Sequence, residues 1–213
     1  MDDWHDIAQD EFIGELYSDF ARDVLAGRDE LYGEVVNQFT SERLQSFYVD
    51  NPKIAEPALW ALSEARALLA DHVAAALVMG VVATEVGLKA TLLKPILHGL
   101  IHEESLAGFV VELVPDQRND KFRDLLFAIL SEYGGIDLRT FKRAGLAQTL
   151  WEEIVNVQKV RNALIHRAEQ VATQDAQKAI DIASAVVNDL FPGVIAKLGL
   201  HTHGQLEVCG RKH

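Results

Sequence analysis

An arginine, an amide and a histidine lie close together near the end of one predicted helix. They are Arg161, Asn162 and His166, and they stand where the surrounding pattern calls for Leu, Val and Ile. The planar guanidinium of arginine suits phosphate oxygens, and a histidine gains and loses its proton near neutral pH. This combination of residue types suggests phosphodiester chemistry.

The helix predicted over residues 146–169 carries an apolar stripe with Arg161 in its middle. With about 100° per residue, the stripe spans roughly 80° of the helix surface. Its members are Leu150, Ile154, Val157, Leu164 and Ala168. A charge at such a position must be paired or must line a cleft. His166 lies about 140° around the helix from Arg161, and it shares a face with Asn162 at four residues' distance.

One straight helix therefore does not bring Arg161 and His166 together. Either the helix loosens after Ile165 so that His166 swings back, or a second copy of the chain supplies the missing group. The second arrangement predicts a homodimer, because an isologous two-fold contact would bring two arginines and two histidines to one cleft.

Glu85 and Lys89 form a second anomaly, two charges four residues apart in an otherwise apolar predicted helix. Glu before Lys at this spacing is a favourable pair. One interpretation is a buried ion-pair network that joins Glu85 to Arg161 or Lys89. The other makes Glu85 a supporting group that orients Arg161.

The composition indicates a globular protein of a reducing compartment. The chain has 213 residues, 49% of them hydrophobic, and one cysteine, Cys209, so one chain can form neither a disulfide framework nor a thiolate metal site. Its first residues are acidic and lack the pattern of a signal peptide. The apolar stretch 73–101 is interrupted by Glu85, Lys89, Lys94 and Pro95, which predicts a buried helix and no membrane role. We expect a cytoplasmic protein.

Most of the negative charge belongs to the N-terminal segment. Residues 1–56 hold 14 acidic and 4 basic residues of a chain whose net charge is −12, so the other 157 residues are nearly balanced. This distribution weakens the objection that an acidic protein does not bind nucleic acid. The segment is either a solvated helical arm or an acidic cover over a basic groove.

The pattern along the chain predicts an all-α protein, an up-and-down helical bundle with an additional N-terminal helical segment. Apolar residues recur at helical spacing, and no run alternates with period two. The predicted parts are an acidic helical segment over 1–56, a bundle over 57–198 and a flexible tail over 199–213. In the N-terminal segment, helices are predicted over 6–26 and 29–48. Two more are predicted over 57–97, with a break near 71 and a kink or end at 94–95. The last three are predicted over 118–133, where Gly134 and Gly135 stop the helix, over 146–169, and over 173–197 with Thr173 as N-cap.

The arrangement of Arg161, Asn162 and His166 at the end of one helix, followed by the Ala-rich helix 173–197, resembles the HEPN domain family. An Arg, a polar residue, and a His four to six positions after the Arg form that family's signature. The Glu85-x-x-x-Lys89 motif also looks like an acidic motif of several HEPN branches. The resemblance covers about residues 57–198.

The resemblance implies a dimeric α-helical bundle that, in many members, is a metal-independent endoribonuclease of toxin, phage-defence or RNA-processing systems. It would make Arg161 and His166 catalytic and Asn162 their supporting polar residue, with RNA as substrate and an antitoxin or other protein as possible partner. Ala168 departs from the tyrosine that many toxins of the family have two residues after the His. The alternative is a catalytically inactive HEPN-like module that binds a nucleotide or a protein.

Plainer interpretations remain open beside the resemblance. His166 can be a helix-terminal histidine, favourable to the helix dipole, and Arg161 an ion-pair residue of the core. A helical scaffold whose acidic segment docks on a basic partner is a further alternative. The His98-x-x-x-His102 pair is interpreted as a solvated helix end, and the tail histidines as poorly preorganised ligands. We therefore predict no metal site and no cofactor.

Overall fold

The computed structural model describes residues 30–100, 124, 127, 128, 130–132 and 134–210. Residues 1–40 belong to one compact unit and residues 41–213 to a second. The second unit begins at residue 41, whereas the sequence predicts that the bundle begins at residue 57. The helices predicted over 6–26 and over most of 118–133 lie outside the described residues.

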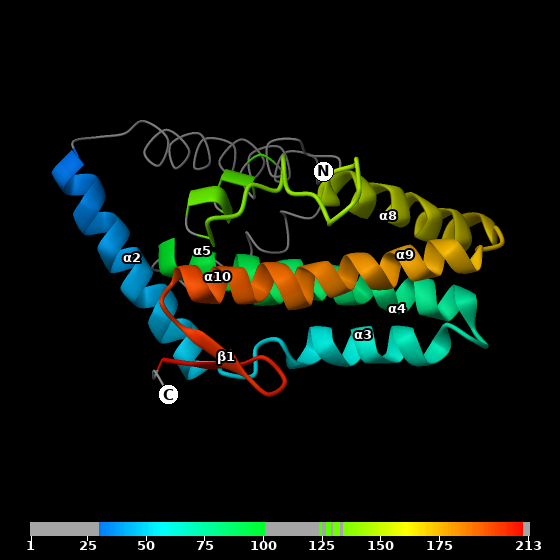
Figure 1. The fold of residues 1–213 in the computed structure, drawn as a ribbon, viewed down its shortest axis with the longest axis horizontal. Coiled ribbons are helices and arrows are strands. Elements are labelled where there is room, and N and C mark those ends of the chain that lie inside the picture. The colour runs from blue at the N-terminus through cyan, green and yellow to red at the C-terminus, as the bar shows by residue number, and fades with distance from the viewer. Residues whose placement is uncertain (1–29, 101–123, 125–126, 129, 133, 211–213) are drawn as a thin grey trace, which may run out of the picture. The chain divides into compact units, whose positions relative to one another are not determined.

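The described part of the chain is all-α apart from one short hairpin, which confirms the predicted fold class. Figure 1 shows the order of the elements. They are α2 (Glu30–Asp50), α3 (Glu56–Leu68), α4 (Val73–Val86), the π-helix η1 (Gly87–Leu93), α5 (Lys94–Leu100), α8 (Leu150–Arg167), α9 (Thr173–Ser184), the π-helix η2 (Ala185–Leu190), α10 (Phe191–Lys197), β1 (His201–His203) and β2 (Glu207–Cys209).

The core forms where α4 and α9 lie side by side (Figure 1). A Cβ atom built on Gly80 would lie 2.9 Å from the Cβ of Ala179, and one built on Gly87 would lie 2.9 Å from Cγ1 of Val186. From the first contact to the second, the residue number rises by seven on both sides, so α4 and α9 run in the same direction. The backbones approach closely because glycine has no side chain at these positions.

Two helical hairpins surround this contact. The short turns 69–72 and 168–172 return the chain, so that α3 packs against α4, and α8 packs against both α9 and α4. Three of the four buried residues of α3 are alanines, and all four recur at helical spacing, which lets the helices pack closely. They are Ala58, Ala61, Leu62 and Ala65. The predicted apolar face of the last long helix is confirmed, since all of its members are buried. They are Ala176, Ile180, Ala183, Val187 and Leu190.

The sequence predicts a kink or an end at Lys94 and Pro95, and the structure shows that the helix does not end there. It continues from α4 through η1 into α5. In an α-helix the carbonyl of Thr91 would accept a bond from the N–H of residue 95, which a proline lacks. The hydroxyl of Tyr48, on α2, donates to that carbonyl at 2.9 Å. Burial raises the pKa of Tyr48, so its phenol keeps the proton that it donates.

The second long helix is built in the same way. Pro192 follows η2 as Pro95 follows η1, and the helix runs without interruption to Lys197, as predicted. A π-helical turn shifts the hydrogen bonds by one residue, which accommodates a residue that has no N–H. The predicted N-cap of this helix is wrong by one residue: Ala172 occupies that position, without a side-chain cap, and Thr173 is the first helical residue.

The predicted flexible tail forms an antiparallel hairpin over residues 201–209, in which His201 faces Cys209 and His203 faces Glu207. Val208 is buried, and its N–H donates to the carbonyl of Pro52 at 2.9 Å. The strands are three residues long, too short to show a periodicity. The tail is ordered because it contacts the bundle, and the sequence pattern does not reveal this contact.

Two segments of the described chain are long and apolar enough to cross a membrane by composition, Val73–Leu93 and Thr173–Lys197. Buried core helices pass the same test. These segments contain α4 and α9, the two helices whose contact forms the core.

Replacing Tyr48 by Phe tests its role beside Pro95. We expect the free energy of unfolding to fall by about 1–3 kcal/mol, because the Thr91 carbonyl loses the hydrogen bond from the buried Tyr48 hydroxyl. In a Pro95→Ala background the same replacement should cost clearly less, since the alanine supplies an N–H. Urea denaturation of the four proteins measures both costs. Equal costs in the two backgrounds would contradict this explanation.

Candidate functional site

Arg161 lies on α8 and reaches across to α4. Its Nη2 donates to Oε1 of Glu85 at 2.9 Å, and its Nη1 donates to Oδ1 of Asn162, also at 2.9 Å. The Arg161 side chain keeps 27% of its surface exposed and that of Glu85 31%. The guanidinium is thus fixed by one carboxylate and one amide while part of it still faces solvent. A guanidinium has five N–H donors, so further donors remain for an anion.

Glu85 is shared between two residues of α8. Besides Arg161, the Nε2 of Gln158 donates to its Oε1, at 3.5 Å. Of the two ion pairs considered from the sequence, the structure contains the one with Arg161. Lys89 is half-buried and takes part in no ion pair or hydrogen bond with the described residues.

His166 lies exposed near the end of α8, and within the described part of the chain nothing bonds to its ring. The helix remains regular through Arg167 and ends where Ala168 adopts a left-handed conformation with φ of 52°. The arrangement in which the helix loosens after Ile165 is therefore not found. The single chain leaves Arg161 and His166 on different sides of α8.

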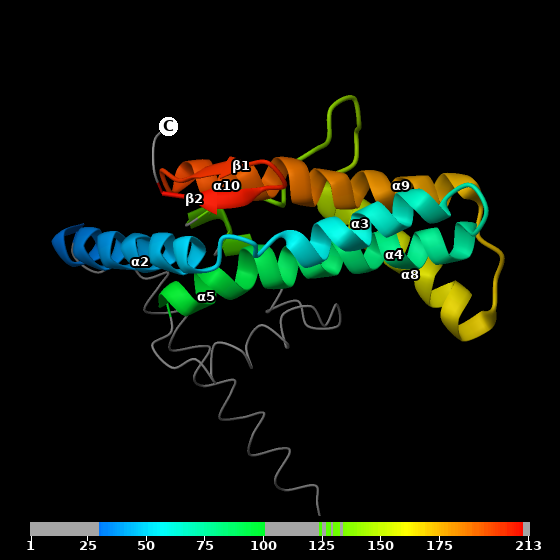
Figure 2. The same cartoon turned by 90° about the horizontal axis from the view of Figure 1, so that it is seen from below.

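The last turns of α8 leave the bundle. Leu150, Ile154 and Val157 are buried, but the predicted stripe weakens beyond Arg161, where Leu164 is half-buried and Ala168 exposed. Figure 2 shows this end of α8 turning away from α9. Ile165 is 53% exposed beside His166. The helix thus presents Arg161, His166 and apolar surface at its outer end.

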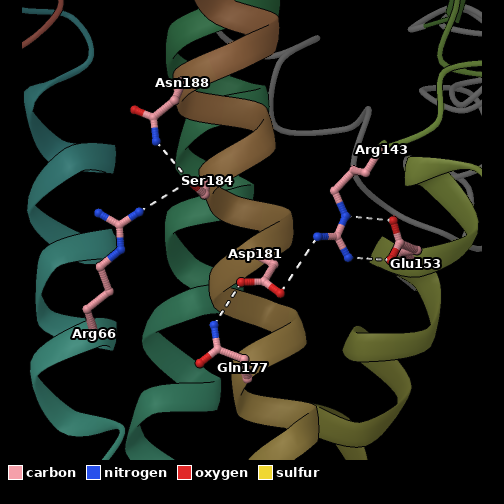
Figure 3. A network of polar contacts seen from close by, with 7 residues as sticks. All are labelled: Arg66, Arg143, Glu153, Gln177, Asp181, Ser184 and Asn188. Atoms are coloured by element: carbon pink, nitrogen blue, oxygen red, sulfur yellow. Dashed lines mark hydrogen bonds and ion pairs between the residues drawn. The ribbon is translucent and has the colours of Figure 1, made fainter. Parts of the chain in front are cut away.

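The first turns of α8 are held by an ion pair that was not among the predicted site residues (Figure 3). Arg143, in the loop before α8, donates from Nε and Nη2 to the two carboxylate oxygens of Glu153, at 2.9 and 2.6 Å. The Glu153 side chain is only 9% exposed. The hydrogen bonds to Glu153 raise the pKa of the Arg143 guanidinium. Glu153 lies about 20° outside the roughly 80° range of the apolar stripe, so the helical periodicity that singles out Arg161 gives no such signal for Glu153.

This pair continues into a polar network along the outer side of α9 (Figure 3). Nη1 of Arg143 lies 3.7 Å from Oδ2 of Asp181, and Gln177 donates to the other oxygen of that carboxylate at 2.8 Å. One turn further, Ser184 Oγ accepts from Arg66 at 3.2 Å and from Asn188 at 2.9 Å. The first group of contacts connects α8 to α9, and the second connects α3 to α9 and η2; we assign both a structural role.

The beginning of α8 is fixed by a capping box. Thr149 Oγ1 accepts from the N–H of Glu152, and the Glu152 carboxylate accepts from the N–H of Thr149 at 2.8 Å. Helix α8 therefore begins at Leu150 and not at the predicted residue 146. Together with the Glu153 pair, the cap sets the position of α8 in the bundle.

Among the residues that the structure describes, no three His, Cys, Asp or Glu side chains lie together as a metal site would require. This covers the hairpin residues His201, His203 and Cys209. Residue 102, the second histidine of the other candidate pair, is outside the described ranges. The candidate site consists of protein groups that can bind an anion and transfer a proton.

Comparisons of the chain with family models, with curated proteins and with solved structures found no match. The fold class therefore stands on the structure, and the resemblance to HEPN domains stands on the motif around Arg161.

Removing the charge of Glu153 tests how α8 is held. We expect Glu153→Gln to lower the free energy of unfolding by about 3 kcal/mol, because the largely buried Arg143 would lose its two-bond carboxylate partner and keep only the longer contact with Asp181. The matched control is Glu152→Gln, the same change at an exposed neighbour in which glutamine can still serve the capping box. It should change stability by less than about 0.5 kcal/mol. Similar losses for both variants in urea denaturation would speak against the role given to Arg143.

Proposed function

We propose that this chain is a metal-independent endoribonuclease of the HEPN type, a cytoplasmic homodimer that cleaves RNA. The observation that carries the proposal is the combination of fixed contacts and partial exposure at the Arg161 side chain. A guanidinium that is oriented by Glu85 and Asn162, yet partly exposed, fits the binding of a phosphate. His166 follows on the same helix, exposed and available for proton transfer.

In the proposed reaction the 2′-hydroxyl oxygen of RNA attacks the adjacent phosphorus. The new O2′–P bond forms and the P–O5′ bond breaks, which leaves a 2′,3′-cyclic phosphate and a 5′-hydroxyl. One His166 accepts the proton of the 2′-hydroxyl, and the His166 of the second subunit donates a proton to the leaving oxygen. Arg161 binds the non-bridging oxygens and stabilises the charge that develops on them.

The geometry of α8 supports the proposal of a second subunit. Because α8 stays straight between Arg161 and His166, one chain does not direct both groups to one phosphate. The outer end of the helix carries exposed Ile165 and half-buried Leu164, apolar surface that a second copy would cover. A two-fold axis near this end would bring both arginines and both histidines to one cleft.

One observation favours the alternative of a catalytically inactive HEPN-like module. The Glu85 carboxylate lies on Arg161 and offsets part of its charge. A module of this kind would bind a nucleotide or a protein through the same surface without cleaving RNA. A role in a toxin or phage-defence system, with an antitoxin as partner, follows from the resemblance alone and belongs to the proposal.

Incubation of the pure protein with RNA in EDTA separates the two functions. We expect fragments with cyclic-phosphate ends, and a loss of rate of about 10²-fold or more in His166→Ala, from the loss of acid–base catalysis. Arg161→Ala should lose about 10²- to 10³-fold, because the charge on the phosphate is no longer stabilised. The control is His72→Ala, at another exposed histidine. Cleavage that is unchanged in both site variants would refute the enzyme.

A further inference from the structure

The two arginine–glutamate pairs that hold α8 share one bond and differ in the other. Nη2 of Arg143 donates to Oε1 of Glu153, and Nη2 of Arg161 donates to Oε1 of Glu85 in the same way. Arg143 adds a second bond, from its Nε to Oε2 (Figure 3). Nε of Arg161 and Oε2 of Glu85 form no hydrogen bond with the described residues. Because such pairs frequently form two parallel bonds, the open second position needs a cause.

The structure offers Gln158 as that cause. From one turn before Arg161 on α8, its Nε2 donates to the same Oε1 of Glu85, at 3.5 Å. Each carboxylate oxygen of Glu153 instead accepts one of the two bonds from Arg143. Two donors on Oε1 of Glu85 fix the direction of its carboxylate and leave Oε2 outside the pair.

Gln158 keeps its amide at a cost in stability. Its Oε1 is buried and accepts no hydrogen bond within the described part of the chain. A buried acceptor without a donor destabilises a fold, and an apolar side chain of the same length would avoid that cost. The bond to Glu85 is the one polar contact of the Gln158 side chain among the described residues. What the amide contributes is therefore the orientation of Glu85.

We propose that Gln158 is a positioning residue for phosphate binding: it holds Glu85 in a one-bond contact and so leaves Nε of Arg161 free to donate to RNA. This Nε is not among the buried side-chain atoms that lack a partner in the described residues, so a phosphate can reach it. Without Gln158, the Glu85 carboxylate would turn, form a second bond with Arg161 and occupy that donor. The inference rests on the proposed ribonuclease function and adds to it a residue that acts through Glu85.

The first measurement needs no RNA. It is the rate at which the Nε proton of Arg161 exchanges with water, followed by NMR of the full-length ¹⁵N-labelled chain and assigned with Arg161→Lys. Gln158→Met keeps the length of the side chain and removes the donor. We expect exchange to slow by about tenfold in this variant, because Nε gains a hydrogen bond to a charged group. Equal exchange rates in the two proteins would overturn the inference.

The second measurement is the salt dependence of RNA binding. The probe is a fluorescein-labelled single-stranded RNA with 2′-O-methyl groups throughout, which 2′-hydroxyl attack does not cleave. Each phosphate contact to single-stranded nucleic acid contributes about 0.7 to the slope of log K against log salt concentration. We expect Gln158→Met to reduce the slope by up to that amount. In a Glu85→Gln background the same replacement should change nothing, since no carboxylate is left to turn. An equal loss in both backgrounds would mean that Gln158 does not act through Glu85.

Gln177→Met is the matched control. It removes an amide that donates to another carboxylate, that of Asp181 on α9, and should change neither the exchange rate nor the slope. The melting temperature of each variant separates positioning from structure: we expect that of Gln158→Met to be no lower than that of the wild type. If it is lower, Gln158→Leu replaces this variant in both measurements.

The outcomes separate the inference from the proposed function. Slower exchange with an unchanged slope overturns the role of Gln158 in phosphate binding and leaves the ribonuclease in place. No RNA binding by the wild type overturns the proposed function, and the exchange rate still decides whether Gln158 orients Glu85. Slower exchange together with a slope lost only in the presence of Glu85 supports the inference.

Discussion

The close approach of α4 and α9 is the constraint on which the other positions depend. At Gly80 an added Cβ would lie 2.9 Å from Ala179 Cβ and 3.0 Å from its backbone carbonyl carbon, so no larger residue fits without a shift of the backbone. The turn after α8 connects it directly to α9. When α9 lies against α4, α8 is brought to α4 as well, and Glu85 comes within hydrogen-bond distance of Arg161.

Two ion pairs then hold α8, and they differ in how much of each pair remains free to bind a ligand. The Arg143 pair uses both oxygens of Glu153, in a setting where the carboxylate is nearly buried. The Arg161 pair uses one oxygen of Glu85 and leaves about a quarter of the arginine exposed. The first arrangement leaves Glu153 no free oxygen, so its role is to hold the helix. The second leaves donors on Arg161, so it can orient the guanidinium and still permit a ligand.

Helical periodicity predicted those features of the fold that depend on the local spacing of apolar residues. The fold class, the end of the last long helix and its buried face follow from the spacing of apolar residues, and they are confirmed. The pairing of Arg161 with Glu85 was one of two pairings that helix phase allowed. The side-chain hydrogen bond to the Thr91 carbonyl beside Pro95 was not predictable, because its donor, Tyr48, lies 47 residues before Pro95 in the chain. The hairpin at 201–209 likewise depends on contact with the bundle, and in the proposed function His166 would meet Arg161 only across a contact between two chains.

The central claim is that two subunits form one catalytic cleft. It is tested most directly by refolding a fixed amount of wild-type protein with increasing amounts of His166→Ala protein and measuring RNA cleavage, with His72→Ala as the control subunit. The account predicts that cleavage per wild-type chain falls as mixed dimers form, because each mixed cleft lacks one of its two histidines, and that the control subunit causes no such fall. Cleavage per wild-type chain that stays constant in excess His166→Ala protein would contradict the shared cleft.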